Sequence, residues 1–175
     1  MTADEFLRLH GDESGIELVN GQIVRLPMTG GRHGEVCGHA AYAIGSFVKG
    51  NKLGRMATNH TFIVTSPTSV RGADVLFVSY AILPTNMPTP VGALTPPLEL
   101  VVEVRSPTDS FADLDDKADE YLRAGVRVVL VLDPETESAG VYRLNELPHR
   151  FHNGDVVTLP EVLPGFAVPA SRFFE

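Results

Sequence analysis

Cysteine is almost absent from this sequence, because Cys37 is the only one among its 175 residues. A single cysteine excludes an internal disulfide and points to a reducing compartment, so we expect a cytoplasmic protein. Long hydrophobic runs are absent too, since none approaches the roughly 20 apolar residues that cross a bilayer. The charged start MTADEFLRLHGDE lacks the apolar core of a signal peptide. The sequence therefore predicts no membrane partner.

Positive charge is also scarce. The chain has 14 lysines and arginines against 22 acidic residues, which gives a net charge of −8. Most nucleic-acid-binding proteins carry a basic surface, so any nucleic-acid site here must be local or assisted by a metal ion. Hydrophobic residues make up 43% of the chain, which is ordinary for a globular protein. We expect a single domain over residues 1–175.

Several familiar catalytic and metal-binding motifs are missing. The stretch GGRHGE lacks the lysine and hydroxyl of a phosphate-binding P-loop, and no G-x-S-x-G nucleophile motif occurs. His33, Cys37 and His39 are zinc-type ligands. However, His39 leaves the helix face that the other two share and no fourth ligand follows, which disfavours structural zinc. His33, near a helix start, is a candidate general base or orienting group; the alternative is an ordinary surface histidine.

The hydrophobic periodicity predicts an α/β protein with one mixed β-sheet flanked by helices. Asp109 or Ser110 is the expected cap of the last helix, Gly125 its end, and the five prolines of 84–97 predict a loop. The predicted helices span 3–10, 33–50 and 110–125. The predicted strands are a hairpin in 15–26 turning at Asn20-Gly21, then 61–65, 73–79, 98–104 and 126–133, followed by short edge strands in AGVYRL, in HRFHNGDVVTL and in the proline-rich tail.

Two carboxylates stand inside apolar strands, Asp74 in RGADVLFVS and Glu103 in LELVVEV. Valine on both faces of the second strand predicts burial on both sides, where an ionised carboxylate is costly unless it is paired or binds a metal. If the strands are neighbours and the acids face each other, their repulsion raises a pKa or recruits a cation. Mg2+ prefers such oxygen ligands. The alternative is that each acid is solvated near a strand end.

Lys117 lies about 80° from the apolar centre of its predicted helix, using the 100° step of an α-helix. It therefore flanks the face that packs on the sheet and contributes little to the core. From this position it can reach toward a strand end. On periodicity alone the favoured interpretation is a surface ion pair with Asp113 four residues earlier.

Five stretches in this order resemble a large bacterial family of restriction-endonuclease-like proteins within the PD-(D/E)-x-K nuclease superfamily. They are IELVNGQIV, RHGEV, RGADVLFVS, PPLELVVEVRSPTDS and DLDDKADEYLRAGVRVVLVLDPET. The resemblance covers about residues 15–145 and implies a restriction-endonuclease-like core. It also implies that Asp74, Glu103 and the Val104 carbonyl are ligands of Mg2+ or Mn2+. Ala73 stands where the superfamily motif has proline, which removes no ligand.

The resemblance also assigns roles around these ligands. The superfamily lysine normally follows the glutamate by two residues, and Arg105 stands there instead, as a candidate phosphate contact. Lys117 matches the lysine that similar proteins carry on the following helix. Glu17 and His33 match the family's hairpin glutamate and helix-start histidine. With Asp74 and Glu103 they form the implied catalytic set.

The activity implied by the resemblance is metal-dependent hydrolysis of phosphodiester bonds in DNA. One alternative is a catalytically inactive nuclease fold kept as a binding or scaffolding module, because fold does not fix function. A weaker alternative is metal-assisted hydrolysis of another substrate. We also expect a two-fold homodimer, because the C-terminal stretch EVLPGFAVPASRFFE offers more apolar surface than a small edge needs to bury.

Overall fold

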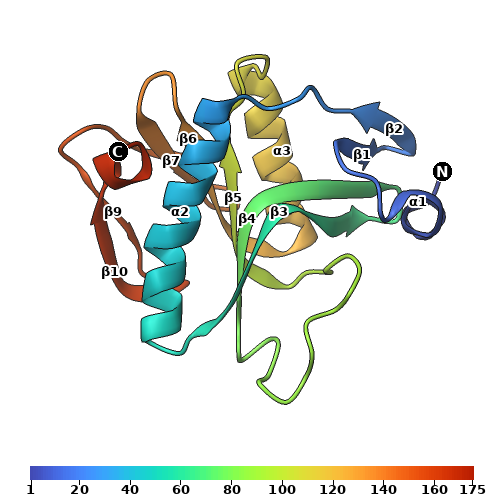
Figure 1. The fold of residues 1–175 in the computed structure, drawn as a ribbon, viewed down its shortest axis with the longest axis horizontal. Coiled ribbons are helices and arrows are strands. Elements are labelled where there is room, and N and C mark those ends of the chain that lie inside the picture. The colour runs from blue at the N-terminus through green and yellow to red at the C-terminus, as the bar shows by residue number, and fades with distance from the viewer.

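The computed structural model describes residues 1–175 and shows a mixed β-sheet with helices on both faces (Figure 1). The helices are α1 (Ala3–His10), α2 (Gly31–Gly50), α3 (Phe111–Ala124) and the 3-10 helix η1 (Ala170–Phe173). The strands are β1 (Ile16–Val19), β2 (Gln22–Arg25), β3 (Gly54–Ser66), β4 (Ser69–Ser79), β5 (Leu98–Val104), β6 (Val126–Asp133), β7 (Ser138–Tyr142), β8 (His149–Phe151), β9 (Val156–Leu159) and β10 (Leu163–Pro169). The predicted α/β class with helices flanking a mixed sheet is confirmed.

The main sheet has eight strands in the order β2-β1-β4-β5-β6-β7-β8, with β3 paired to β4. Only β5 and β6 run parallel, and α3 forms the crossover between them. Both strands are buried along nearly their whole length, as their valine-rich sequences predict. The expectation of edge strands after β6 is partly wrong: β7 is buried inside the sheet, and β9 and β10 form a separate two-stranded sheet.

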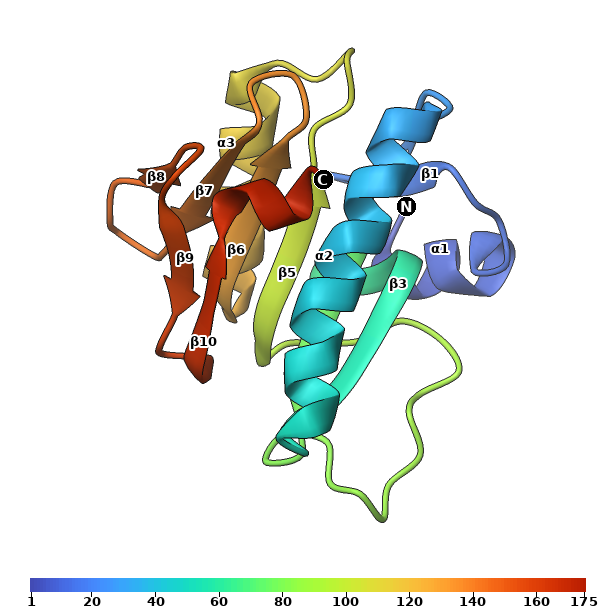
Figure 2. The ribbon, with the colours of Figure 1, turned by 60° about the vertical axis from the view of Figure 1, so that its left-hand side comes forward.

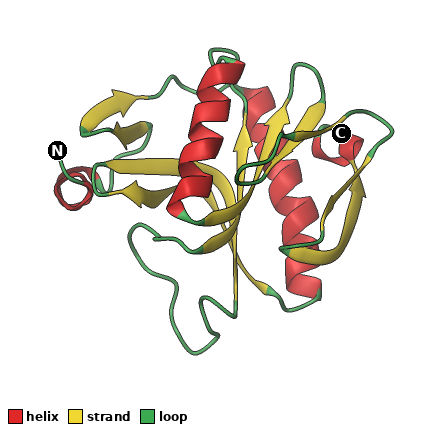
Figure 3. Cartoon of the chain, turned by 180° about the vertical axis from the view of Figure 1, so that it is seen from behind, coloured by secondary structure: helices red, strands yellow, loops and turns green.

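The two faces of the sheet carry different layers. Helix α2, the β9–β10 pair and η1 cover one face (Figure 2), and α3 covers the other (Figure 3). Valines and leucines alternate between the two cores along β5, where Leu100 and Val102 face α2 and Val101 faces α3. Full burial of one such side chain contributes roughly 1.5–3 kcal/mol. None of the helices combines the length and apolar character needed to cross a membrane.

Local signals in the sequence set the helix ends. Ser110, rather than Asp109, is the N-cap of α3, and its side chain exchanges hydrogen bonds with the backbone and carboxylate of Asp113 in a capping box. Gly125 ends the helix with a left-handed φ of 109°. The ion pair with Asp113 that periodicity favours for Lys117 does not form, because Lys117 pairs with Glu17 and Glu103 instead.

Strand β3 starts at Gly54 rather than near residue 61, because a bulge hides its first half from the period-2 pattern. Asn59 and His60 have positive φ values at the bulge. Across the ladder, a Cβ on Gly72 would lie 2.0 Å from the His60 ring, so glycine is required there. The carbonyl oxygen of Gly72 accepts a hydrogen bond from Lys117 of α3.

The C-terminal segment folds back onto the molecule. Phe166, Phe173 and Phe174 are buried against α2 and the sheet, together with neighbouring apolar residues. The apolar surface on which the dimer expectation rested is therefore covered within the chain. Residues 84–97 form a loop, as predicted, at the end of the sheet opposite the start of α2 (Figure 1).

Candidate functional site

A cavity of about 510 Å3 lies where the β1–β2 hairpin, the start of α2, the end of β5 and α3 meet. Its polar lining is mainly acidic. The lining carboxylates are Glu17, Asp74, Glu103, Asp109 and Asp113, and the permanent cations are Arg71 and Lys117. Six of the sequence-predicted residues therefore meet in one place: Glu17, His33, Asp74, Glu103, Val104 and Lys117. An anionic ligand entering this cavity would meet an excess of negative charge.

Glu103 is buried on the α3 side of β5 and is fully engaged. Its Oε2 accepts a hydrogen bond from Lys117 Nζ at 2.9 Å, and its Oε1 accepts one from the Tyr121 hydroxyl at 2.8 Å. Burial, with the nearby charges of Asp74 and Glu17, raises the pKa of Glu103 to about 7, although Lys117 acts in the opposite direction. The presence of this carboxylate inside the core of the sheet thus has a local explanation, because a lysine and a tyrosine from α3 hydrogen-bond to it.

Glu17 is the second buried carboxylate, with only 2% of its side chain exposed. It accepts hydrogen bonds from the Gly72 amide at 2.9 Å and pairs with Lys117 at 3.0 Å and Arg71 at 3.0 Å. Burial works to raise its pKa, but Lys117, Gly72 and Arg71 together lower it below its usual value. Glu17 is therefore a carboxylate that stays charged and holds Lys117 in place.

Lys117 joins the two buried acids. Its Nζ contacts Glu103, Glu17 and, at 3.3 Å, the carbonyl oxygen of Gly72. Burial works to lower its pKa, but the charges of Glu103 and Glu17 outweigh burial and raise the pKa above its usual value. An ammonium has three N–H donors, and three acceptors occupy them here. The side chain is a charged part of the core, not a surface partner of Asp113.

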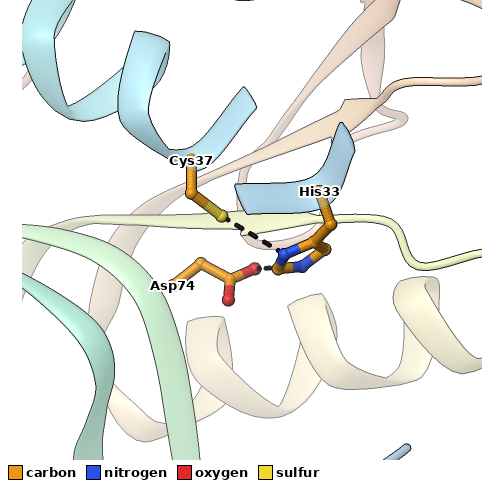
Figure 4. A group of neighbouring side chains, drawn as sticks. All are labelled: His33, Cys37 and Asp74. Atoms are coloured by element: carbon orange, nitrogen blue, oxygen red, sulfur yellow. Dashed lines mark hydrogen bonds and ion pairs between the residues drawn. The ribbon is translucent and has the colours of Figure 1, made fainter. Parts of the chain in front are cut away.

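Asp74 lies in the middle of β4 and is more exposed than Glu103. It directly precedes Val75, which the β4–β5 ladder pairs with Val102, the neighbour of Glu103. Its Oδ2 accepts a hydrogen bond from the Val104 amide at 2.8 Å. The His33 Nε2 lies 3.3 Å from the same oxygen (Figure 4). Asp74 is thus oriented by backbone while 18% of its side chain stays exposed.

His33 and Cys37 contact Asp74 from successive turns of α2 (Figure 4). Burial works to lower the pKa of His33, but hydrogen bonds to Asp74 and Cys37 outweigh it and raise the pKa to about 10. Burial and the negative charge of Asp74 raise the pKa of the Cys37 thiol, against the effect of His33. His39 is outside this group, as its helical position predicts.

One family model matches nearly the whole chain. The model of the Uma2 family, described as "Putative restriction endonuclease", matches residues 3–171. The chain belongs to the Uma2 family. The solved structure of a protein described as a putative nuclease belonging to DUF820, from Anabaena variabilis ATCC 29413, superposes with a TM-score of 0.87 at 21% sequence identity. It covers 99% of this chain and 97% of that chain, so the predicted nuclease-like fold is confirmed. No curated protein matches the chain.

Arg105 of this Uma2 chain lies beside the cavity rather than in it. Its Nη1 pairs with Asp133 at 3.3 Å and Glu135 at 2.7 Å, its Nε donates to the Asp109 carbonyl at 3.2 Å, and its guanidinium covers the Phe111 ring at 4.6 Å. It lines a second cavity of about 330 Å3, next to the first. Its charge is therefore largely compensated within the chain.

Three residues of this Uma2 site have no role in the sequence interpretation: Arg71, Glu120 and Tyr121. Arg71 donates to Glu120 at 2.9 Å and to Glu17, which links α3 to the hairpin. Glu120 also accepts a hydrogen bond from Thr65 at 2.5 Å. Tyr121 carries a weak signal, since it falls on the apolar stripe one turn after Lys117. No periodic signal marks Arg71 or Glu120, because their partners come from distant strands.

Proposed function

We propose that this protein is a nuclease that hydrolyses phosphodiester bonds of DNA with the help of Mg2+ or Mn2+. The observation that carries the proposal is the convergence of Asp74, Glu103 and Lys117 on one cavity in a chain of the Uma2 family. The description of that family as a putative restriction endonuclease, and of the similar structure as a putative nuclease, supports the same activity.

The residues of the cavity fit a hard divalent cation. Asp74 and Glu103, with the Val104 carbonyl, would supply the oxygen ligands that Mg2+ prefers. Burial first, and then the negative charges of Asp74 and Glu17, raise the pKa of Glu103, and a bound cation would favour its charged form. A phosphate would be repelled by the lining carboxylates unless a cation were bound there. The bound cation would polarise the phosphate and lower the pKa of a water molecule.

The side chains around this pair have separable tasks. Tyr121 and Lys117 fix the orientation of Glu103, and the Val104 amide fixes that of Asp74. Lys117 would orient the attacking water or stabilise charge on the phosphate oxygens. Because its three donors are already engaged, it must give up one contact to do so.

Glu17 and His33 would act on the residues that contact the ligand, not on the ligand itself. Glu17 keeps Lys117 charged and in position. His33 lies against Asp74 and would orient that carboxylate.

A binding or scaffolding module without catalysis is the second candidate. The specific observation in its favour is that Lys117 and Arg105 are each paired with two carboxylates of the chain. In this alternative the buried network only holds α3 on the sheet, since such polar groups can serve the fold alone. The two candidates differ in their need for a divalent cation.

A homodimer belongs to the same proposal. One cavity of this kind cuts one strand, so a double-strand break calls for two copies of the chain. Two-fold dimers are the commonest soluble oligomers. Sedimentation velocity at micromolar concentration should show the dimer, and only monomer there would count against it.

The activity is tested by incubating the protein with supercoiled plasmid and with single-stranded DNA, with Mn2+, with Mg2+ or with chelator. Metal-dependent cleavage should disappear in Asp74→Asn and Glu103→Gln and persist in Asp155→Asn. Asp155 is a matched control, because it also accepts a backbone N–H at 2.8 Å, in an exposed turn. Absence of cleavage in the natural protein with either metal would favour the binding module.

A further inference from the structure

A second group of metal-type ligands adjoins the acidic cavity. His33 and Cys37 are four residues apart on α2, so they share one face of the helix. Asp74 of β4 completes the group from the sheet (Figure 4). One donor atom from each of the three residues lies within 4.8 Å of the other two. A helical pair at this spacing is a known way of holding zinc, as in the H-E-x-x-H motif.

The distances match a tetrahedral transition-metal site. The His33 Nδ1 lies 3.5 Å from the Cys37 Sγ. With Zn–S near 2.3 Å and Zn–N near 2.0–2.1 Å, tetrahedral geometry separates these two donors by about 3.5 Å. In the structure, the His33 ring presents Nδ1 to Cys37 and Nε2 to Asp74. Because one ion binds one ring nitrogen, the Asp74 or His33 side chain must rotate to bring the carboxylate and Cys37 to the same nitrogen.

The chemistry of these donors differs from that of the carboxylate pair. A thiolate and an imidazole select Zn2+ and similar transition metals, whereas Mg2+ takes oxygen ligands. Three protein ligands also leave a fourth position for water, which is the arrangement of an open zinc site. The sequence-based argument against structural zinc assumed His39 as the third ligand. The structure supplies Asp74 in its place, from a strand 37 residues after Cys37.

We infer that His33, Cys37 and Asp74 form a binding site for a single Zn2+-like transition-metal ion, distinct from the hard-cation pair of Asp74 and Glu103. This site does not depend on the proposed nuclease activity. Because Asp74 belongs to both ligand sets, occupancy by Zn2+ competes with the Mg2+ or Mn2+ that the activity would need.

Cobalt(II) chloride is the probe that tests the site, because a Cys37–Co2+ bond gives a thiolate-to-metal charge-transfer band in the near ultraviolet. The purified full chain should show this band with one equivalent bound. The band should vanish in Cys37→Ala and Cys37→Ser, and His33→Ala should weaken Co2+ binding roughly tenfold or more. Addition of Zn2+ should displace Co2+ and erase the band in the natural protein.

Two variants separate this site from its surroundings. His39→Ala removes a histidine of the same helix outside the group and should leave the band unchanged. Glu103→Gln disables the hard-cation pair and should also leave it unchanged. Absence of a thiolate band in the natural protein, or unchanged Co2+ affinity in His33→Ala, would overturn the inference. Loss of the band in Glu103→Gln would do the same, because the metal would then belong to the carboxylate pair.

Discussion

The two carboxylates of the cavity have contrasting surroundings. Glu103 lies in the sheet with 7% of its side chain exposed, and both of its oxygens accept hydrogen bonds from α3. Asp74 has 18% of its side chain exposed and contacts a backbone amide and His33. The first is held by a buried network of charges, and the second is more exposed in the same cavity. The contrast separates a proposed ligand that also belongs to the buried network from one that does not.

The difference predicts how changes on each side should divide between stability and activity. A charge removed from the buried network leaves its partners unpaired in a medium of low dielectric constant, which is expensive. A neutral amide at Asp74 removes the partner of His33, but the imidazole can lose its proton and become neutral, so the cost should fall mainly on ligand binding. Variants of the buried network and variants of Asp74 should therefore differ more in their unfolding free energies than in their cleavage rates.

The largest effect should come from Lys117→Met. It leaves Glu17 and Glu103 without their shared cation, and breaking a buried ion pair in this way typically costs about 3–5 kcal/mol. Urea unfolding followed by circular dichroism should show that loss, and metal-dependent cleavage should disappear. Lys49→Met, on an exposed part of α2, is the control and should change neither. An unfolding free energy equal to that of the natural protein would show that the network does not stabilise the fold.

Asp74→Asn should show the opposite pattern, a small loss of stability with a large loss of cleavage. The amide oxygen can still accept from the Val104 N–H, so we expect the unfolding free energy to fall by less than about 1 kcal/mol. Cleavage with Mn2+ should fall roughly 100-fold or more, because a carboxylate ligand is lost. The measurement pairs urea unfolding with initial cleavage rates. A large loss of stability with cleavage retained would place Asp74 in the scaffold instead.

Tyr121→Phe tests a single hydrogen bond of the buried network around Glu103. It removes one hydrogen bond to Glu103 while keeping the ring, so the expected loss is about 1.5–3 kcal/mol of stability and roughly tenfold in cleavage rate. Tyr142→Phe is a matched control, since its hydroxyl donates to Asp115 at 2.7 Å, away from the cavity. Loss of stability without any change in the cleavage rate would limit Tyr121 to a structural role.

Much of this fold is visible in the sequence because local signals coincide with tertiary ones. The valines on both faces of β5 and β6 predict two buried strands, and the Ser110 cap and Gly125 bracket α3. The first half of β3 is hidden because the bulge at Asn59 and His60 breaks its alternation. The C-terminal phenylalanines look available for a partner because sequence alone does not show that α2 covers them.

Some residues of the site can also be found in the sequence, and others cannot. Asp74 and Glu103 can be found in the sequence because charged residues inside apolar strands are anomalous. The burial of Lys117 cannot, because the wheel places it at the edge of the stripe and its partner Glu17 is 100 residues away. Arg71 and Glu120 escape for a related reason, since their pairing depends on how α3 crosses the sheet.

Arg105→Ala should have the smallest effect on chemistry. The guanidinium is paired with Asp133 and Glu135, and only its Nη2 donates no hydrogen bond within the chain. A compensated charge of this kind contributes about 0.5–1 kcal/mol to phosphate binding, so KM for DNA should rise roughly two- to fivefold while kcat changes less than twofold. Steady-state cleavage kinetics provide the measurement. Arg123→Ala, which removes an exposed arginine of α3, is the control. A fall in kcat as large as that of Asp74→Asn would instead place Arg105 at the reacting phosphate, the position that its place in the sequence suggests.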